Sequence, residues 1–199
     1  MARTRSPDFK HRKEQIANIA AQLFAKHGYH ATSINDIAAA SGTAKSRLYH
    51  YFSSKEQLLY ELLKDHAQLL EFRLGAALAA HGPAQERLLT YTKELLAINI
   101  RARKEHTIIL SELDKLSPIH RVEITALLRA PIEGLYDLLC EINPGLSAQQ
   151  DKKFPAAMLL IGMINWSHTW FDAQGPLPSE QYAKMICDTF IGGFSEAAL

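Results

Sequence analysis

The chain has 199 residues, which suits one large or two small domains, and 47% of them are hydrophobic, so a sizeable core is available and a disordered chain is excluded. The formal net charge is only +1, but residues 1–55 hold nine Lys or Arg against three acidic residues, a net charge of +6 that leaves −5 for residues 56–199. A basic region on a slightly acidic body is the electrostatic pattern of nucleic-acid contact, although a merely solvated basic tail gives the same count.

Targeting and membrane segments are not expected. The N-terminus has no apolar core of the kind found in secretion signals. The longest apolar run, residues 156–164, is half of the roughly 18 residues that a bilayer requires, so we expect a cytoplasmic protein. Cys140 and Cys187 are solitary in apolar helical surroundings and are interpreted as small buried hydrophobes without a disulfide.

Catalytic motifs are missing from the sequence. It contains no metalloprotease, paired-cysteine, phosphate-loop or nucleophile-elbow motif, and we expect no metal, no cofactor and no enzymatic activity. A catalytic triad whose residues come together only in the folded chain has no linear motif, so a helical enzyme with an unrecognised site is an alternative.

The first predicted helix covers residues 9–27. Apolar residues repeat along it at three- and four-residue spacing and form one stripe: Ile16, Ile19, Ala20, Leu23 and Phe24. Gly28 follows directly and can take the left-handed conformation that ends a helix.

Two short helices are predicted at residues 34–41 and 45–51. Ser33 is a candidate N-cap, and Asp36 three positions on completes a capping box. Gly42 is placed to end the first of the two, since glycine takes a left-handed conformation without steric penalty. Two helices joined by a short turn containing glycine are typical of a helix-turn-helix unit, and the helix at 9–27 supports the pair.

The helix at 45–51 carries side chains suited to DNA. Leu48 and Phe52 lie four residues apart and are expected to anchor it inward, which leaves the polar side chains outside: Lys45, Ser46, Arg47, Tyr49 and His50. Lys and Arg donate to phosphates or guanine, and Ser and Tyr donate to phosphates or base edges. Lys55 begins the next helix, whose free N–H groups could join it in clamping a phosphate. The alternative is an exposed polar helix that binds nothing.

The rest of the chain is also helical by pattern. Predicted helices cover residues 55–80, 84–103, 105–116, 118–142, 148–173 and 178–197, with breaks at glycine and proline clusters. No run of alternating β-branched residues predicts a strand. The predicted fold class is all-α with about nine helices: an N-terminal three-helix helix-turn-helix domain at residues 1–55 and a helical ligand-binding and dimerisation body at residues 56–199.

The body is expected to hold a dimer surface and a ligand. Residues 158–170 and 182–194 are apolar at helical spacing and include Gly162, Gly192 and Gly193, which allow close approach; ordinary core packing is the alternative. Polar residues that interrupt the apolar body are candidate ligand contacts: Tyr91, Asn99, Arg103, His106, Ser111, Arg129, Asn165, Trp166 and His168. For each of them surface exposure is the alternative, and for Asn165 and His168 a satisfied core hydrogen bond is another.

Three motifs carry a specific resemblance. Ala-Xaa-Xaa-Leu-Phe-Xaa-Xaa-His-Gly-Tyr ends at residue 29, Thr-Ser-Ile-Xaa-Asp-Ile-Ala covers residues 32–38, and Leu-Tyr-His-Tyr-Phe-Xaa-Ser-Lys-Glu-Xaa-Leu covers residues 48–58. With them, residues 12–66, about a quarter of the chain, resemble the DNA-binding region of the TetR family of bacterial transcriptional regulators. The resemblance implies phosphate contacts at Ser33, Tyr49, Tyr51 and Lys55, and base contacts at Lys45, Ser46 and Arg47.

Some positions depart from the family pattern. Thr43 replaces the usual apolar turn residue, and Ala44 stands where the recognition helix often has a capping serine, so Thr43 is a candidate cap and DNA contact. Arg47 is bulkier than the small residue common at its position, and we expect it to alter the operator sequence that is read. The family also implies a four-helix dimer interface from the last two helices of each subunit.

A weaker resemblance concerns the C-terminal part. Gly-Met-Ile-Asn-Trp-Ser-His-Thr-Trp-Phe at 162–171, Gly-Pro-Leu at 175–177 and Tyr-Ala at 182–183 resemble a TetR subgroup that tends to regulate breakdown of fatty acids, sterol fragments or aromatic acids and to sense acyl-CoA thioesters. This resemblance implies that basic residues of the body meet the CoA phosphates, with these candidates: Arg101, Arg103, Lys104, Arg121 and Arg129.

The sequence thus predicts a ligand-responsive transcriptional repressor that binds a near-palindromic double-stranded DNA operator as a homodimer. We expect an acyl-CoA thioester or a related apolar acid derivative to release it, by binding better to a conformer whose recognition helices do not match the half-sites. The alternatives are a drug-responsive repressor of efflux genes, the helical enzyme, and a monomeric protein-interaction module without salt-dependent DNA affinity.

Overall fold

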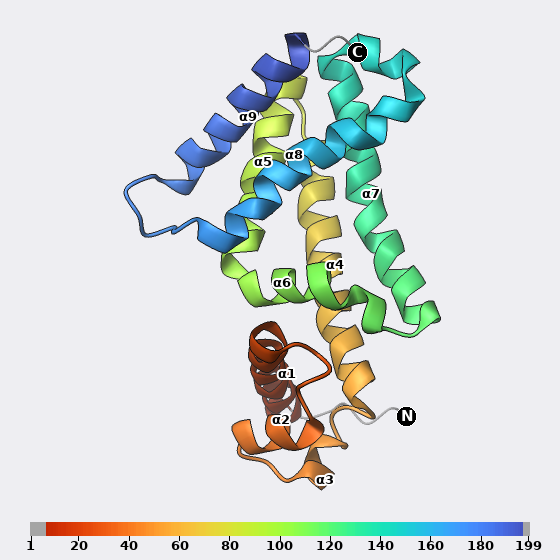
Figure 1. The fold of residues 1–199 in the computed structure, drawn as a ribbon, viewed down its shortest axis with the longest axis vertical. Coiled ribbons are helices and arrows are strands. Elements are labelled where there is room, and N and C mark those ends of the chain that lie inside the picture. Colours follow the sequence, from red (N-terminus) through yellow and green to blue (C-terminus); the bar gives the residue numbers. More distant parts are fainter. Residues whose placement is uncertain (1–6, 197–199) are drawn as a thin grey trace. The chain divides into compact units, whose positions relative to one another are not determined.

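The computed structural model describes residues 7–196, which fold into helices joined by short turns (Figure 1). The elements, with η for a 3-10 helix, are α1 (Pro7–His27), α2 (Ile34–Ala40), α3 (Lys45–Leu48), α4 (Lys55–Leu78), α5 (Ala84–Arg101), α6 (Arg103–Glu112), η1 (Leu113–Lys115), α7 (Pro118–Ile142), η2 (Pro144–Ala148), α8 (Gln150–Trp170) and α9 (Ser179–Glu196). Within this range no residue lies in a strand, and the prediction of an all-α fold with about nine helices is confirmed. None of the described helices combines the length and apolarity needed to cross a membrane.

The chain forms two compact units. The first contains the described residues up to His66 together with Lys104–Ile124, and the second contains Ala67–Arg103 and the described residues from Thr125 onward. The first unit therefore holds α1, α2, α3, the first half of α4, nearly all of α6, and the start of α7. A segment that follows α5 in sequence thus belongs to the same compact unit as the predicted helix-turn-helix. The division into functional domains after residue 55 stays a prediction.

In the first unit, α1 packs on α2, and α2 on α3. Ile16, Ala20 and Phe24 of the predicted α1 stripe are buried. Ile37 of α2 and Leu48 of α3 are 0% exposed. Burying a large apolar side chain contributes about 1.5–3 kcal/mol, whereas helices this short are marginal alone. Packing, more than helix propensity, therefore holds α2 and α3 in place.

The predicted capping box of α2 and the two predicted glycine turns of this unit are confirmed. Ser33 Oγ accepts a hydrogen bond from the Asp36 N–H at 3.1 Å, and the Asp36 carboxylate accepts one from the Ser33 N–H at 2.8 Å. Gly28 and Gly42 have φ angles of +83° and +61°, which lie in the left-handed region. Both glycines therefore end the preceding helix as the sequence predicts.

The recognition segment differs from its prediction in two respects. Its α-helix covers only Lys45–Leu48, and the residues up to Tyr51 continue as tighter turns, with His50 N–H bonded to Arg47 O at 3.1 Å and Tyr51 N–H to Leu48 O at 2.9 Å. The expected Thr43 cap is wrong. The N-cap is Ala44, which has no side-chain acceptor, and Thr43 Oγ1 is buried without a hydrogen-bond partner among the described residues.

In the second unit, α5 packs against α8 and α9, which also contact each other. Leu88 and Leu96 of α5 are 0% and 1% exposed, and Leu160 and Ile164 of α8 are 0% exposed. Cys187 of α9 lies in the same core at 3% exposure, and burial raises the pKa of its thiol. The Cys187 interpretation as a buried hydrophobe is confirmed, whereas Cys140 is only half-buried. α5, α8 and α9 thus form one close-packed group.

Candidate nucleic-acid interface

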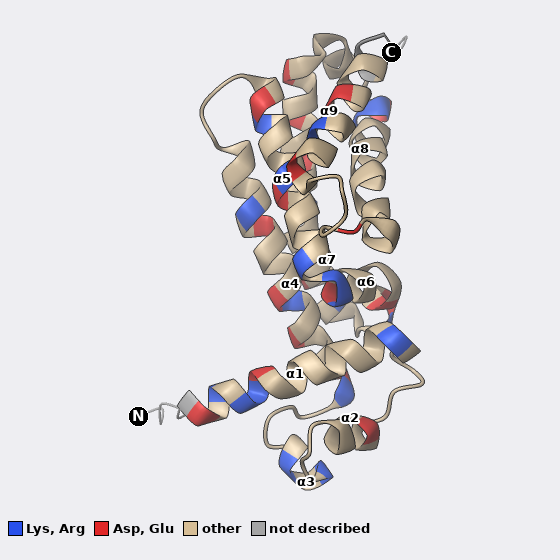
Figure 2. Ribbon diagram, turned by 90° about the vertical axis from the view of Figure 1, so that its left-hand side faces the viewer, with Lys and Arg blue, Asp and Glu red and all other residues tan. Residues whose placement is uncertain are grey.

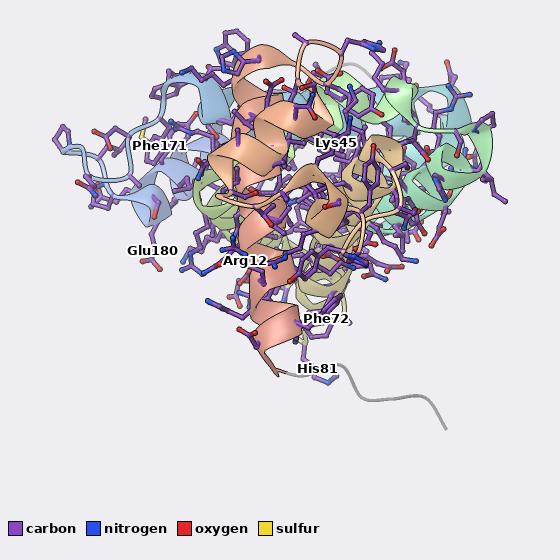
Figure 3. The ribbon with its side chains drawn as sticks, turned by 90° about the horizontal axis from the view of Figure 1, so that it is seen from below. Arg12, Lys45, Phe72, His81, Phe171 and Glu180 are labelled. Carbon is purple, nitrogen blue, oxygen red and sulfur yellow. The ribbon has the colours of Figure 1, made fainter. Side chains whose placement is uncertain are left out.

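The recognition segment has one buried side and one exposed side. Leu48 is 0% exposed and Phe52, just beyond α3, is 1% exposed, so both predicted anchors are in the core. The predicted DNA-facing side chains are all exposed: Lys45, Ser46, Arg47, Tyr49 and His50. None of the ion pairs among the described residues involves Lys45 or Arg47. Both cations are therefore available to an anionic partner, and α3 carries no acidic residue beside them (Figures 2 and 3).

Side chains of α1 fix the ends of α2 and α3. Arg12, labelled in Figure 3, donates to the Ser41 carbonyl at 2.7 Å and so satisfies the C-terminal end of α2. Lys13 lies over the Phe52 ring at 5.0 Å from its centroid and forms an ion pair with Glu61 of α4. The segment that contains α3 is therefore held by contacts with α1 on both sides of that helix.

Ser33 is exposed and lies at the start of α2. Its Oγ accepts from the Asp36 N–H, which leaves the hydroxyl proton to donate to a phosphate oxygen. The side-chain and backbone hydrogen bonds from Ser33 hold the pKa of Asp36 below its ordinary value, so the capping box is complete at neutral pH.

Lys55 makes contacts that its sequence position did not predict. Its ammonium donates to the Tyr29 carbonyl at 2.8 Å and to the Thr32 carbonyl at 3.0 Å, and lies 4.1 Å from the centroid of the Tyr29 ring. An ammonium has three N–H donors, so one is left for a phosphate. Lys55 is thus a structural tie between α4 and the turn after α1, and its phosphate contact stays a prediction.

The remaining predicted DNA contacts differ in exposure. Tyr49 is 47% exposed, whereas Tyr51 is half-buried because its ring stacks on Phe9 of α1 at 4.7 Å between centroids. The Thr43 hydroxyl is buried, unlike the polar atoms of the exposed face. A DNA contact by Thr43 Oγ1 would therefore require the turn to open.

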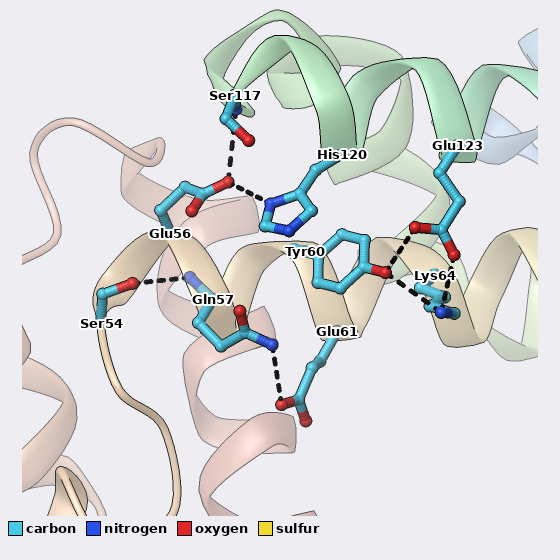
Figure 4. Close-up of polar contacts among 9 residues, drawn as sticks. All are labelled: Ser54, Glu56, Gln57, Tyr60, Glu61, Lys64, Ser117, His120 and Glu123. Atoms are coloured by element: carbon cyan, nitrogen blue, oxygen red, sulfur yellow. Dashed lines mark hydrogen bonds and ion pairs between the residues drawn. The ribbon is translucent and has the colours of Figure 1, made fainter.

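A polar network joins α4 to the start of α7 within the first unit (Figure 4). Glu56 Oε1 accepts from the Ser117 N–H at 3.3 Å and lies 2.6 Å from His120 Nδ1. One turn further along α4, Tyr60 donates to Glu123 at 2.7 Å and stacks on the His120 ring at 3.8 Å. We call Glu56, Tyr60, Lys64, Ser117, His120 and Glu123 the α4–α7 brace; Lys64 completes it with an ion pair to Glu123 at 2.7 Å.

The segment before the brace also reaches the helix-turn-helix. Glu112, at the end of α6, accepts a hydrogen bond from the Tyr29 N–H at 3.2 Å, next to the Gly28 turn. Sequence reasoning missed these residues because the partners lie more than 60 positions apart, for example 83 positions between Tyr29 and Glu112. No local pattern marks such a pair.

The predicted ligand contacts are only partly brought together. In the second unit, Asn99 Nδ2 donates to Asn165 Oδ1 at 3.1 Å, and His168 Nδ1 lies 2.5 Å from the Asn165 carbonyl oxygen. Tyr91 is 1% exposed on α5, and Arg103 donates to the Phe171 carbonyl at 2.7 Å. The structure therefore brings Asn99, Asn165 and His168 together.

The other four predicted ligand contacts have different surroundings. Ser111 is exposed on α6 and donates to the Thr107 carbonyl at 2.9 Å. Arg129 is exposed and pairs with Glu133 at 3.5 Å, and Trp166 is 67% exposed. His106 belongs to the first unit, where it is 3% exposed and its ring lies 5.8 Å from that of His66.

An apolar surface covers the second unit on α8 and α9. Large side chains exposed there lie at helical spacing: Met158 39%, Leu159 66%, Trp166 67% and Trp170 54% on α8, and Met185 55% on α9. Gly162, Gly192 and Gly193 are exposed on the same helices, and a Cβ at each would meet no atom within 4 Å. We call this surface the α8–α9 face; it lies within the two segments predicted to form the dimer.

With its exposed cationic face on a short helix after a glycine turn, the first unit is that of a helix-turn-helix DNA-binding regulator. Residues 16–62 match the family described as bacterial regulatory proteins, tetR family, and residues 81–194 match the family described as tetracyclin repressor-like, C-terminal domain. The chain belongs to the tetR family of bacterial transcriptional regulators, which also makes it a regulator and not an enzyme.

Individual relatives match over nearly the whole chain. The HTH-type transcriptional repressor KstR2 of Mycobacterium tuberculosis is 42% identical over 194 residues, which cover 93% of this chain and 94% of the relative. A TetR-family transcriptional regulator from Bordetella parapertussis has a solved structure that is 34% identical, covers 94% of this chain and 97% of its own, and superposes with a TM-score of 0.87. AibR, solved in complex with isovaleryl coenzyme A and operator DNA, is 27% identical over 91% of this chain and 96% of its own, with a TM-score of 0.74.

Proposed function

We propose that this protein is a ligand-responsive transcriptional repressor that binds a near-palindromic operator as a homodimer. The exposed cations Lys45 and Arg47, which form no ion pair among the described residues, carry this proposal, because they lie on an anchored helix and suit the major groove of DNA. Base contacts are assigned to Lys45, Ser46 and Arg47. Phosphate contacts are assigned to Ser33, Tyr49, Tyr51 and the third donor of Lys55, with His50 beside them. A contact by Thr43 would require the turn that buries its hydroxyl to open. Binding of operator DNA implies a cytoplasmic protein, which is part of this proposal.

Dimerisation is proposed through residues 158–170 and 182–194. The α8–α9 face supports it, since contiguous exposed apolar side chains on a folded protein mark an interaction surface. Trp166 is assigned to this interface in preference to the ligand. Two copies joined across a twofold axis would carry two recognition helices, which matches a palindromic operator.

The effector is proposed to be an acyl-CoA thioester or a related apolar acid derivative. The similarity to AibR, whose structure holds isovaleryl coenzyme A, supports this class. We assign Asn99, Asn165, His168 and Tyr91 to the end of the ligand that carries the acyl group. Basic residues at exposed positions suit its phosphates: Arg101, Arg103, Lys104, Arg121 and Arg129. His106 remains a candidate contact from α6.

Selection of bound sequences from a randomised duplex library tests whether the protein binds a specific operator. The selected duplex then serves to test release by the effector. We expect a sequence with twofold symmetry and one half-site per protomer. Isovaleryl-CoA should then release the selected duplex at micromolar concentrations, whereas isovaleric acid should not. A selected sequence without symmetry would contradict the homodimer, and release by neither compound would contradict the effector class.

A further inference from the structure

The search for chemistry outside the DNA-facing surface leads to one buried amide. Asn99 of α5 is 0% exposed, and its Nδ2 donates to Asn165 Oδ1 on α8 at 3.1 Å. Its own Oδ1 is buried and accepts no hydrogen bond from any residue that the structure describes. A buried acceptor without a donor raises the free energy of the folded state. Packing alone therefore does not explain why this position holds an amide.

The surroundings of this oxygen are apolar. Leu95 and Leu96 precede Asn99 by one helical turn and are 5% and 1% exposed, and Ile161 and Ile164 flank Asn165 at 8% and 0% exposure. All four belong to the core cluster that joins α5 to α8 and α9. In such surroundings a hydrogen bond is stronger than in water, and a missing one is correspondingly more unfavourable.

Two less deeply buried polar residues of α8 lie next to the Asn99 amide. Asn165 and His168 are half-buried, and His168 Nδ1 lies 2.5 Å from the Asn165 backbone carbonyl oxygen, which can only accept. The buried Asn99 side chain is therefore joined to the half-buried Asn165 side chain, and His168 contacts the backbone of Asn165 one turn further along α8. A ligand that carries both apolar and polar groups suits these surroundings.

We propose that Asn99 Oδ1 is the acceptor for a hydrogen-bond donor on the effector, and that it selects effectors carrying an amide N–H or a hydroxyl next to an apolar group. This inference rests on the proposed function, since it assigns the effector to the second unit. An effector with a donor completes the amide pair, whereas one without a donor leaves Asn99 Oδ1 unsatisfied in the complex. Sites with such a group discriminate strongly against ligands that lack the partner.

Two synthetic probes that differ in one group test the proposal. S-isovaleryl-N-acetylcysteamine has an apolar acyl group and a single amide N–H, and its ester counterpart has an oxygen in place of that N–H. We expect wild-type protein to bind the amide probe at least about tenfold more tightly than the ester, by calorimetry or fluorescence titration. Equal affinities for the two probes would overturn the proposal, and this comparison needs no variant.

A pair of variants separates ligand recognition from packing. Asn99→Leu replaces the amide by an apolar group of similar size, and should abolish the preference for the amide probe in a protein that still folds. Thr92→Val is the matched control, because Thr92 is also 0% exposed on α5 and its hydroxyl accepts from the Cys187 thiol at 3.2 Å. It should retain the preference. A lower melting temperature for Asn99→Leu with an unchanged preference would make Asn99 a structural residue bound to buried water.

Operator release separates this inference from the function on which it rests. Release of the selected duplex by isovaleryl-CoA, with no difference between the two probes, would overturn the role of Asn99 and leave the proposed function intact. Failure of isovaleryl-CoA to release DNA, together with binding of neither probe, would overturn both.

Discussion

At the scale of single residues, Lys55 stabilises the fold and is also proposed to contact DNA. Two of its three N–H donors hold the Tyr29 and Thr32 carbonyls of the segment between α1 and α2. That segment leads directly into the Ser33 cap, so the ammonium that could touch a phosphate also positions a neighbouring phosphate donor. Removing it should therefore affect stability and DNA affinity together.

Lys55→Ala should weaken binding to all duplexes about equally, reduce the slope of log K against log salt by about one unit, and lower the melting temperature. Affinity measured at several salt concentrations, with a thermal melt of the free protein, checks both parts. Lys45→Ala is the control, because Lys45 is exposed and forms no ion pair among the described residues; it should leave the melting temperature unchanged. A lower melting temperature with an unchanged salt slope would restrict Lys55 to its structural role.

Arg47 is predicted to read a base. It is exposed on α3, and a bidentate contact from Arg to guanine discriminates by about 1–3 kcal/mol per base pair. Arg47→Ala should therefore relax the preference at one position of each half-site, measured as affinities for a panel of single-base operator variants. A loss of affinity that is uniform across the panel would make Arg47 a backbone contact.

At the scale of elements, the turn between α2 and α3 depends on backbone geometry. Gly42 has φ +61°, and a Cβ built there would meet no atom within 4 Å, so only backbone strain opposes a larger residue. Gly42→Ala should destabilise the protein by about 1–2 kcal/mol in urea unfolding. Gly75→Ala is the matched control, because Gly75 lies inside α4 with equally open space, and it should stabilise by up to about 1 kcal/mol. Equal effects at both sites would exclude backbone strain as the cause.

The α4–α7 brace makes stability depend on pH. Burial alone would raise the pKa of Glu56, but the hydrogen bonds from His120 and Ser117 outweigh it and hold this pKa below its ordinary value of 4.5. Hydrogen bonds from Lys64, and then from Tyr60, likewise lower the pKa of Glu123. A carboxyl with a lowered folded-state pKa stabilises the fold fully above its ordinary pKa, and this stabilisation is lost as the pH falls through the folded value.

The free energy of unfolding should therefore decrease below about pH 4.5, and Glu56→Gln should make that decrease smaller. Urea unfolding at a series of pH values measures both proteins. Glu14→Gln, which removes an exposed carboxylate from α1, controls for the change in net charge. The same pH dependence in Glu56→Gln as in wild type would show that the brace does not contribute.

The elements themselves were largely predictable, and the contacts between them were not. Apolar periodicity and the Ser33, Gly28 and Gly42 signals predicted the helices of the first unit because such signals are local. The recognition helix begins at the predicted residue but ends three residues early, because the turns after Leu48 tighten. The brace and the Asn99–Asn165 pair join residues more than 60 positions apart, which no periodicity can reveal.

At the scale of the whole molecule, the regulation that we propose requires two copies of the chain. A single recognition helix reads only a few base pairs, and symmetric operators are read by dimers. The α8–α9 face offers the surface, since its exposed apolar side chains come from two neighbouring helices. In a twofold interface the same residue occurs once on each side, so a single substitution changes the interface twice.

Leu159→Glu should therefore break the dimer and abolish specific operator binding, while the helical content of each chain stays the same. Leu159 is 66% exposed, so the substitution removes little from the core of the protomer, but it would place two carboxylates in an apolar interface. Sedimentation velocity measures the oligomeric state, and circular dichroism measures the fold. Ile119→Glu is the control: Ile119 is 75% exposed on α7, outside the α8–α9 face, and its substitution should leave the dimer intact. A Leu159→Glu protein that stays dimeric and binds its operator would place the interface elsewhere on the chain.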